Sequence, residues 1–263
     1  DRDYLVAQAT KMYAELSCET DEFFSFMKEY ELLDLETRPG KAGGGYMTYF
    51  PDYKAPFIFS NFNGTSGDVD VLTHEAGHAF QVYSSRHNEL PELEFPTYES
   101  CEIHSMSMEF ITWPWSKEFF KEDTDKYHYL HLSSAVKFLP YGVLVDHFQH
   151  EVYNNPNMTP KERKDTWRKL EKMYLPYKNY ESCDFLERGN YWFQQGHIFQ
   201  SPFYYIDYTL AQACSLQFWK RAQENDPTMW QDYLAICEVG GTQSFLGILE
   251  TAHLESPFKF LSS

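Results

Sequence analysis

Long apolar runs and positive charge are scarce in this sequence, and each scarcity argues against a class of function. No uninterrupted apolar run approaches the ~18 residues that a membrane-spanning helix requires, so we expect no membrane partner. Lys and Arg total 22 residues against 39 Asp and Glu, which gives a formal net charge of −17. Because phosphate binding needs a dense Lys/Arg surface, this charge disfavours a nucleic-acid partner.

Cysteine is also scarce, with five residues widely spaced along the chain. Their odd number and their spacing argue against a disulfide framework and against a cysteine-rich metal site. Reduced thiols of this kind are typical of a reducing compartment, so we expect a cytoplasmic protein. The first residues, Asp1 to Tyr4, show no basic start followed by an apolar block, so no signal peptide is visible there.

Apolar and aromatic side chains are abundant, at 43% and 18% of the 263 residues. This size and composition predict a packed globular protein with a sizeable core. Helical periodicity runs through most of the chain, whereas two stretches rich in β-formers predict short strands at 46–50 and 55–62. We therefore expect a mainly α fold with a small β-sheet beside the metal helix described below, in a single domain over 1–263. The predicted helices cover 1–36 (with a second run capped by Thr20 or Asp21), from Ser66 or Asp68 to about Arg86, from Thr97 to about Trp113, 125–153 with an interruption at Pro140, a helix from the Thr159 capping box, 204–224, 227–239 and 244–252.

The stretch from Thr73 to Phe80 contains His-Glu-Ala-Gly-His, with two histidines four residues apart. On a helix, residues four apart are separated by about 40° around the axis, so His74 and His78 leave one face and can bind a single Zn²⁺. Glu75 lies about 100° from His74, too far round to be a comfortable ligand. It is instead well placed to hold and deprotonate a zinc-bound water. Satisfied core histidines without a metal are the alternative, because the helix is apolar on several sides.

A catalytic zinc site of this kind needs a third protein ligand. A third histidine in the pattern H-E-x-x-H-x-x-G-x-x-H is excluded, because Gln81 and Ser84 stand where that pattern has glycine and histidine. The other common plan takes a glutamate from a second helix. We predict Glu102, 24 residues after His78, as the ligand, and Glu99, one turn earlier, as the acceptor for an imidazole N–H. The alternative, two exposed acids, fits poorly with the apolar character of the segment 97–108.

Three glycines, Gly43, Gly44 and Gly45, precede the first predicted strand, which begins at Tyr46. They do not form a phosphate-binding loop, because the spacing of that motif fails on both sides of the neighbouring lysine. We predict a strand edge without side chains that can pair with an extended peptide substrate. A small sheet that only braces the metal helix is an equally good interpretation.

Peptide hydrolysis also needs fixed donors for the charge that develops on the carbonyl oxygen. The segment 196–208 offers His197, which follows a glycine, and two tyrosines at a predicted helix start, Tyr205 and Tyr208. The tyrosines are three residues apart, so their phenolic O–H groups face the same way. With 20 tyrosines in the chain, a packing role is the alternative for each of them.

Together these segments resemble the oligoendopeptidase F branch of the thimet oligopeptidase family of zinc peptidases. The similarity is carried by 74–79 and 99–109, by Gly40–Gly44 upstream, and by 155–160, 196–208 and 240–242 downstream. The resemblance implies a mostly helical, zincin-type catalytic lobe with a deep channel. It implies one Zn²⁺ per chain held by His74, His78 and Glu102, with Glu75 as general base.

The same resemblance implies roles for residues outside the metal motif. The strand from Gly43 to Phe50 would line the substrate cleft. His197 and a tyrosine would bind and stabilise the tetrahedral intermediate, with Tyr208 preferred, Tyr205 beside it and Tyr204 less favoured.

We therefore expect a zinc-dependent endopeptidase that hydrolyses short unfolded peptides. A non-catalytic peptide-binding relative that keeps zinc for structure, and an aminopeptidase of the same broad class, are the alternatives. Family members are usually about twice as long and carry an N-terminal helical lobe on the opposite channel wall. We expect this chain to be the later, catalytic part of a longer protein without that lobe. A separate N-terminal lobe or a homo-oligomer is then the expected partner.

Overall fold

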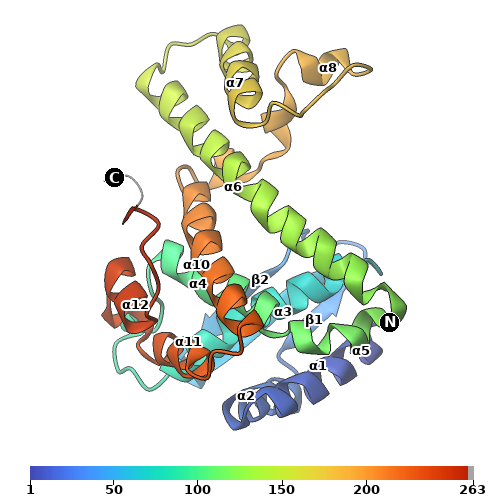
Figure 1. Ribbon diagram of the computed structural model, residues 1–263, viewed down its shortest axis with the longest axis vertical. Helices are drawn as coiled ribbons and strands as arrows, with labels where there is room; N and C mark the ends of the chain where they lie inside the picture. Colours follow the sequence, from blue (N-terminus) through green and yellow to red (C-terminus); the bar gives the residue numbers. More distant parts are fainter. Residues whose placement is uncertain (260–263) are drawn as a thin grey trace. The chain divides into compact units, whose positions relative to one another are not determined.

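The computed structural model of the protein describes residues 1–259, and Figure 1 shows its helices and strands. The chain divides into two compact units. Unit 1 comprises residues 1–130 and the chain from Ala211 onward, and unit 2 comprises residues 131–210. Helices dominate both units, and the strands of the described residues form one small sheet in unit 1. The predicted mainly α fold with a minor sheet is therefore confirmed.

Unit 1 begins with two helices, α1 (Arg2–Leu16) and α2 (Cys18–Glu29). The capping box of α2 is formed by Ser17 and Thr20, so the predicted cap at Thr20 or Asp21 is wrong. Ser17 serves as the cap because its extended backbone lies directly between the two helices and its hydroxyl accepts the N–H of Thr20.

The helix predicted up to residue 36 is also wrong at its end. The segment Leu33–Glu36 is strand β1, which pairs in parallel with β3 (Ala55–Phe62). The chain leaves the helix at Glu31, which has a left-handed backbone with φ of 54°, and the Leu32 carbonyl then accepts the N–H of Ile58. Pairing with a strand distant in the sequence therefore outweighs the local helical periodicity.

The sheet has the strand order β1-β3-β2, where β2 is Tyr46–Phe50. β2 and β3 run antiparallel, with Tyr46 opposite Phe59 and Phe50 opposite Ala55, so both predicted strands are confirmed. Among the described residues, no strand pairs with the other side of β2. One edge of the sheet is therefore open to an added strand.

The sheet packs against α3 (Gly67–Ser85), and α4 (Tyr98–Ile111) packs against α3. The contact between the helices is close at Gly77, where an added Cβ would lie 2.7 Å from the His104 carbonyl oxygen and from Cα of Ser105. A glycine inside a helix costs about 1 kcal/mol relative to alanine. Here it permits a close backbone approach between the two helices that carry the candidate site.

The remainder of unit 1 completes the packing around α3 and α4. The ring of Trp230 stacks on Phe80 of α3, and the Tyr233 hydroxyl donates to the His104 carbonyl in α4 at 2.8 Å. These contacts hold α11 (Met229–Glu238) against both helices. The remaining elements of unit 1 are α5 (Ser116–Phe120), the first turns of α6 (Thr124–Asn154), most of α10 (Tyr205–Gln223), α11 (Met229–Glu238) and α12 (Phe245–Thr251).

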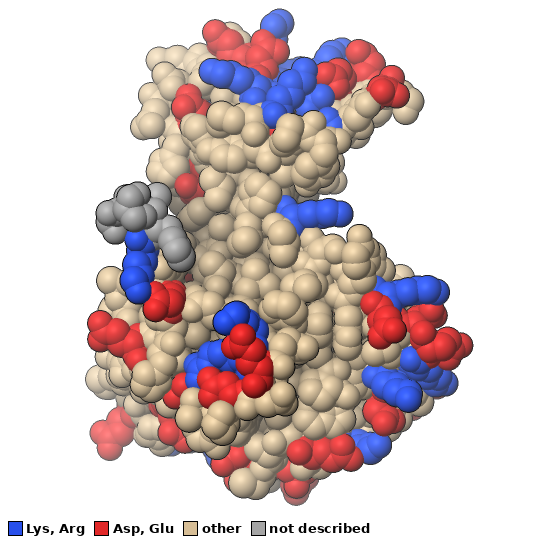
Figure 2. All heavy atoms as spheres, in the orientation of Figure 1, with Lys and Arg blue, Asp and Glu red and all other residues tan. Residues whose placement is uncertain are grey.

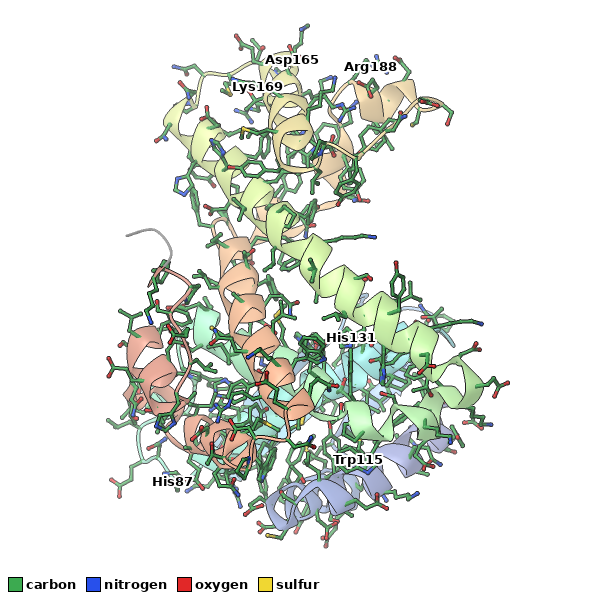
Figure 3. All side chains as sticks on the ribbon, in the orientation of Figure 1. His87, Trp115, His131, Asp165, Lys169 and Arg188 are labelled. Atoms are coloured by element: carbon green, nitrogen blue, oxygen red, sulfur yellow. The ribbon has the colours of Figure 1, made fainter. Side chains whose placement is uncertain are left out.

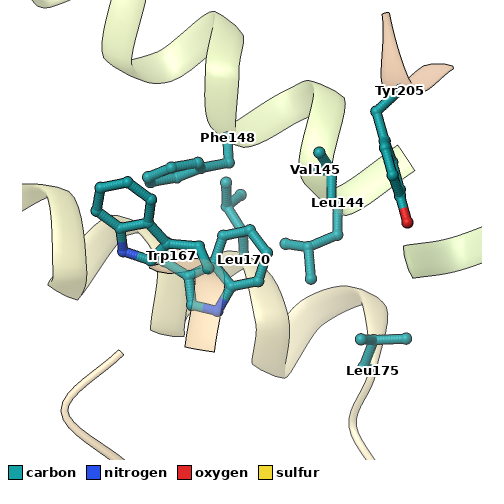
Figure 4. Packing of buried hydrophobic residues seen from close by; sticks show 8 residues of the cluster. Leu144, Val145, Phe148, Trp167, Leu170, Leu175 and Tyr205 are labelled. Carbon is teal, nitrogen blue, oxygen red and sulfur yellow. The ribbon is translucent and has the colours of Figure 1, made fainter. Parts of the chain in front are cut away.

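Unit 2 is built around its own apolar core, shown in Figure 4. The predicted interruption of the long helix at Pro140 is wrong, because α6 continues through this proline. The turns that follow the proline are anchored in the core by Leu144, Val145 and Phe148, which are fully buried. The Thr159 capping box is confirmed at the start of α7. The other elements of unit 2 are α7 (Pro160–Tyr174), α8 (Asp184–Glu187), α9 (His197–Gln200) and the start of α10.

Acidic and basic side chains are interspersed on the face drawn in Figure 2. On α7, for example, exposed Asp165 pairs with Lys161 at 2.5 Å, and Arg188, directly after α8, pairs with Asp184 at 3.3 Å. Figure 3 labels Asp165 and Arg188. Exposed pairs of this kind stabilise a fold by at most about 1 kcal/mol each. No helix within residues 1–259 combines the length and apolarity needed to cross a membrane.

Candidate metal centre

His74 and His78 leave one face of α3, and their Nε2 atoms approach the same carboxylate oxygen on α4. Oε2 of Glu102 lies 3.3 Å from Nε2 of His74 and 3.4 Å from Nε2 of His78. The two imidazole rings are almost perpendicular, with an interplanar angle of 83° and centroids 5.0 Å apart. One ligand atom from each of the three residues lies within 4.8 Å of the others. Three side chains from two helices thus surround one small volume.

These separations can be compared with those of a zinc tetrahedron. Bonds of about 2.0–2.1 Å at tetrahedral angles hold neighbouring ligand atoms about 3.3–3.4 Å apart. Both nitrogen–oxygen separations fall in that range. Two imidazoles and one carboxylate also form a donor set that zinc takes in catalytic sites, where the fourth position is left for water or substrate. The residues present therefore fit a zinc ion.

Glu102 is held in place by its surroundings on α4. Its side chain is buried, and the Ser105 hydroxyl donates to Oε2 at 2.9 Å. Burial by itself raises the pKa of this carboxyl, but the adjacent His78 and His74 outweigh that effect and hold the pKa well below its usual range. A buried carboxylate that stays ionised supplies negative charge for a divalent cation.

The other ring nitrogen of His74 is held by a glutamate that the sequence analysis did not single out. Oε1 of Glu109, also on α4, lies 2.6 Å from Nδ1 of His74. Such a bond fixes the ring orientation and leaves Nε2 for a metal. Glu99, which was predicted for this role, is half-buried and forms no hydrogen bond with either imidazole in the described part of the chain. Glu109 lies seven residues after Glu102, two turns along the same helix face, and this spacing is the signal that could have indicated it.

Glu75 lies between the two histidines in sequence and is 7% exposed. Burial raises the pKa of its carboxyl above the ordinary value, although His74 and His78 partly oppose this shift. A raised pKa makes a carboxylate a better proton acceptor near neutral pH. Gly45 lies against Glu75, since a Cβ placed on Gly45 would be 3.6 Å from Oε1 of Glu75.

The predicted substrate-binding residues form the start of the open sheet edge. Gly43 and Gly44 precede β2, and Gly44 has a left-handed backbone with φ of 93°, which favours glycine. Tyr46 is the first residue of β2 and is half exposed, with its ring stacked on Phe59 at 4.8 Å. The structure therefore brings the glycine segment and the candidate base together in unit 1.

His197, Tyr205 and Tyr208 lie together in unit 2. The hydroxyl of Tyr208 is 3.4 Å from Nε2 of His197, and Nε2 of Gln195 is 2.8 Å from Nδ1 of the same imidazole. Tyr205 is buried in the core of unit 2, and this burial raises the pKa of its phenol to about 12 (Figure 4). Tyr141 in turn donates its hydroxyl to Oε1 of Gln195 at 2.8 Å. Tyr208 thus lies within hydrogen-bond distance of the imidazole, and Tyr205 is buried in the core of unit 2.

A helix that carries two histidines and an adjacent glutamate, and a carboxylate from a neighbouring helix as the third candidate ligand, are features of the H-E-x-x-H class of metallopeptidases. Residues 15–260 match the profile of peptidase family M3. The chain belongs to this family, and the match runs through both compact units.

Individual relatives agree with this assignment. The chain is 26% identical over 227 residues to an oligoendopeptidase F homologue of Borreliella burgdorferi, covering 80% of this chain. An X-ray structure of a candidate oligoendopeptidase F is 63% identical over 99% of this chain, with a TM-score of 0.96. A structure of PZ peptidase A with an inhibitor is 61% identical over 98% of this chain, also with a TM-score of 0.96. The predicted resemblance to oligoendopeptidase F is therefore confirmed.

These relatives are longer than this chain. The chain spans 36% of the length of the Borreliella burgdorferi protein and 46% of each of the two solved chains.

Proposed function

We propose that this chain is the catalytic part of a zinc-dependent endopeptidase that hydrolyses short unfolded peptides. The observation that carries the proposal is the convergence of His74, His78 and Glu102 at separations that suit a zinc tetrahedron, with Glu75 buried beside them. Membership of a peptidase family supports it. The relative solved with an inhibitor is itself a peptidase by name.

The proposed chemistry divides among residues of this chain. His74, His78 and Glu102 hold the metal, and Glu109 orients His74. When bound there, zinc lowers the pKa of a coordinated water toward about 7 and polarises the scissile carbonyl. Glu75 accepts the proton of the attacking water and delivers it to the leaving amine, a role that its raised pKa favours.

Two further groups complete the proposed reaction. The O–H of Tyr208 and an N–H of His197 donate to the carbonyl oxygen as it gains negative charge. Gly43, Gly44, Gly45 and Tyr46 offer backbone groups to an extended substrate. We propose that all of these residues belong to one catalytic domain over 1–263, whose second channel wall comes from a separate N-terminal lobe or from a second copy of the chain. The cysteines, none of which forms a disulfide, support a cytoplasmic location.

A peptide-binding protein with a structural zinc is the competing function. Structural zinc sites usually fill the fourth position with a protein ligand. Three ligands beside a buried carboxylate favour hydrolysis instead.

The decisive experiment compares the zinc-loaded protein with Glu75→Gln on internally quenched peptides. We expect the variant to keep its zinc by elemental analysis and to lose at least ~10²-fold in turnover, because it removes only the general base. Peptides with free and with blocked N-termini should be cleaved alike by an endopeptidase. Equal turnover by Glu75→Gln and wild type would contradict the assignment, and cleavage that needs a free amine would indicate an aminopeptidase.

A further inference from the structure

The glycine segment before β2, residues 41–45, is packed at Gly45 against the proposed catalytic base, Glu75. A Cβ on Gly45 would lie 3.0 Å from Cγ1 of Val71 and 3.6 Å from Oε1 of Glu75. The first distance is tighter than an ordinary van der Waals contact, so a side chain at this position would press on Val71 of α3. The backbone of Gly45 therefore lies directly beside the Glu75 carboxylate.

A side chain of β3, Asn61, holds this segment in its extended position. Its Nδ2 donates to the Ala42 carbonyl at 2.8 Å and to the Gly44 carbonyl at 2.9 Å. Tyr46 pairs with Phe59, so continuing the register by two residues brings Gly44 opposite Asn61. The carboxamide thus takes over the pairing where the backbone ladder stops, and both of its N–H donors are used.

A buried lysine anchors the other end of the segment. The side chain of Lys41 is 1% exposed, and its ammonium donates to the carbonyls of Asp34 and Glu36 in β1 and to the Asp34 carboxylate, at 2.8–3.0 Å. The same ammonium lies 4.4 Å from the ring centroid of Phe59. An ammonium group buried this deeply is stable only when its N–H donors are hydrogen-bonded. The segment is therefore fixed between β1 and β3.

The pairing pattern shows which peptide groups face the open edge. Ile58 donates its N–H toward β1, so the neighbouring Phe57 and Phe59 direct their backbone groups at β2. Their partners Thr48 and Tyr46 consequently direct their own backbone N–H and C=O groups at β3. Peptide groups alternate in direction along a strand, so those of Gly45 and Met47 face outward.

We propose that Asn61 is a positioning residue for substrate binding. Its carboxamide extends the pairing edge of β2 from Tyr46 back to Ala42, so that the outward peptide groups of Gly45 receive the backbone of an extended peptide beside Glu75. The ligand recognised here is a peptide main chain, independent of its side chains. This inference rests on the proposed peptidase function.

The test compares steady-state kinetics of Asn61→Asp and Asn61→Ala with wild type. Asn61→Asp is nearly isosteric but has no N–H to donate, so the two carbonyls lose their partner and the edge is released. We expect KM for an unfolded peptide to rise about tenfold while kcat changes by less than about threefold, because substrate and transition state lose the same contacts. Zinc content should be unchanged.

Thr37→Val is the matched control, because it removes another hydrogen bond from a side chain to β3, at 2.8 Å to the Phe62 carbonyl, away from the glycine segment. A purely structural role for Asn61 predicts that both positions alter thermal stability and neither alters KM. An unchanged KM in Asn61→Asp, or a fall in kcat alone, would overturn the proposal. If Asn61→Ala does not fold, the near-isosteric variant decides.

Peptide binding without turnover separates this inference from the proposed function. In the Glu75→Gln background, fluorescence anisotropy with a labelled peptide should show about tenfold weaker binding when Asn61→Asp is added. A wild type that binds peptide without cleaving it would refute the peptidase assignment, while weaker binding by the Asn61 variant would still support the positioning role. Equal binding by both proteins would refute that role whatever the activity.

Discussion

At the scale of single residues, the site depends on carboxylates with different tasks. Glu102 faces both imidazoles and stays ionised, Glu109 faces the far side of one imidazole, and Glu75 is buried with a raised pKa. The difference comes from neighbours, because all three belong to the same pair of helices. Substitutions at the three positions should therefore have different effects on zinc binding and on turnover.

Glu109→Ala tests the contact at 2.6 Å to Nδ1 of His74. Without this acceptor the imidazole can rotate, so we expect zinc affinity to fall about 10- to 100-fold, the usual effect of losing a partner behind a metal ligand. Competition with a chelating dye measures the affinity. Glu99→Ala, on the same helix, is the control, and it should change affinity less. A larger effect of Glu99→Ala would instead assign the acceptor role to Glu99.

Tyr208→Phe and Tyr205→Phe compare the proposed oxyanion donor with the buried tyrosine beside it. The Tyr208 hydroxyl lies 3.4 Å from the His197 imidazole, whereas Tyr205 contributes to the buried core of unit 2. We expect Tyr208→Phe to reduce kcat by about 10²-fold with zinc retained, the scale for removing one oxyanion donor. Tyr205→Phe should change kcat by only a few fold. The reverse order of effects would move the donor role to Tyr205.

At the scale of elements, the helices α3 and α4 carry the candidate metal ligands together because Gly77 lets them approach closely. The contact leaves no room for a side chain at position 77, since a methyl group there would lie 2.7 Å from backbone atoms of α4. Helix propensity alone favours alanine by about 1 kcal/mol, so a glycine here is unfavourable for the isolated helix.

Gly77→Ala should therefore destabilise the protein and not stabilise it. We expect α4 to be displaced, the free energy of unfolding to fall by about 1–3 kcal/mol, as is common for an overpacked site, and zinc affinity to fall with it. Urea denaturation and metal titration measure the two effects. Gly67→Ala, at the start of the same helix, is the control, because its nearest contact is a side-chain oxygen at 3.4 Å. Equal stability of the two variants would contradict the importance of the close approach.

The helices and strands also differ in how well the sequence alone predicts them. Cap residues and the apolar pattern located α3 and α4, the Thr159 capping box located α7, and β-formers located β2 and β3, because each of these signals is local. β1 was missed because Leu33–Glu36 is a strand only through pairing with residues 58–62. Glu109 was not assigned because its contact with His74 spans 35 positions and depends on how two helices pack. Contacts of this kind are set by tertiary structure and leave little trace in a single sequence.

At the scale of the whole molecule, one family match covers two compact units. The candidate metal ligands and the proposed base lie in unit 1, and the proposed oxyanion donors lie in unit 2. The units are joined within continuous helices, since α6 and α10 each contain residues of both. Metal binding and oxyanion stabilisation are therefore separable by experiment.

Removal of zinc with a chelator tests this separation. The ion would link α3 to α4. At a free concentration of about 1,000 times its Kd, a ligand that binds only the folded protein contributes about 4 kcal/mol to the free energy of unfolding. We expect chelation to lower Tm by several degrees and to increase amide hydrogen exchange in α3 and α4. Exchange in α7, which belongs to the core of unit 2, should be unchanged.

Glu102→Ala provides the control for this experiment. The variant lacks the carboxylate shared by both histidines, so a chelator should no longer shift its Tm or the exchange of α3. A chelator effect of wild-type size in Glu102→Ala would mean that the stabilising metal binds elsewhere. An effect spread equally over α7 would instead mean that the two units unfold together, because a metal that stabilises only unit 1 can protect unit 2 only through shared cooperativity.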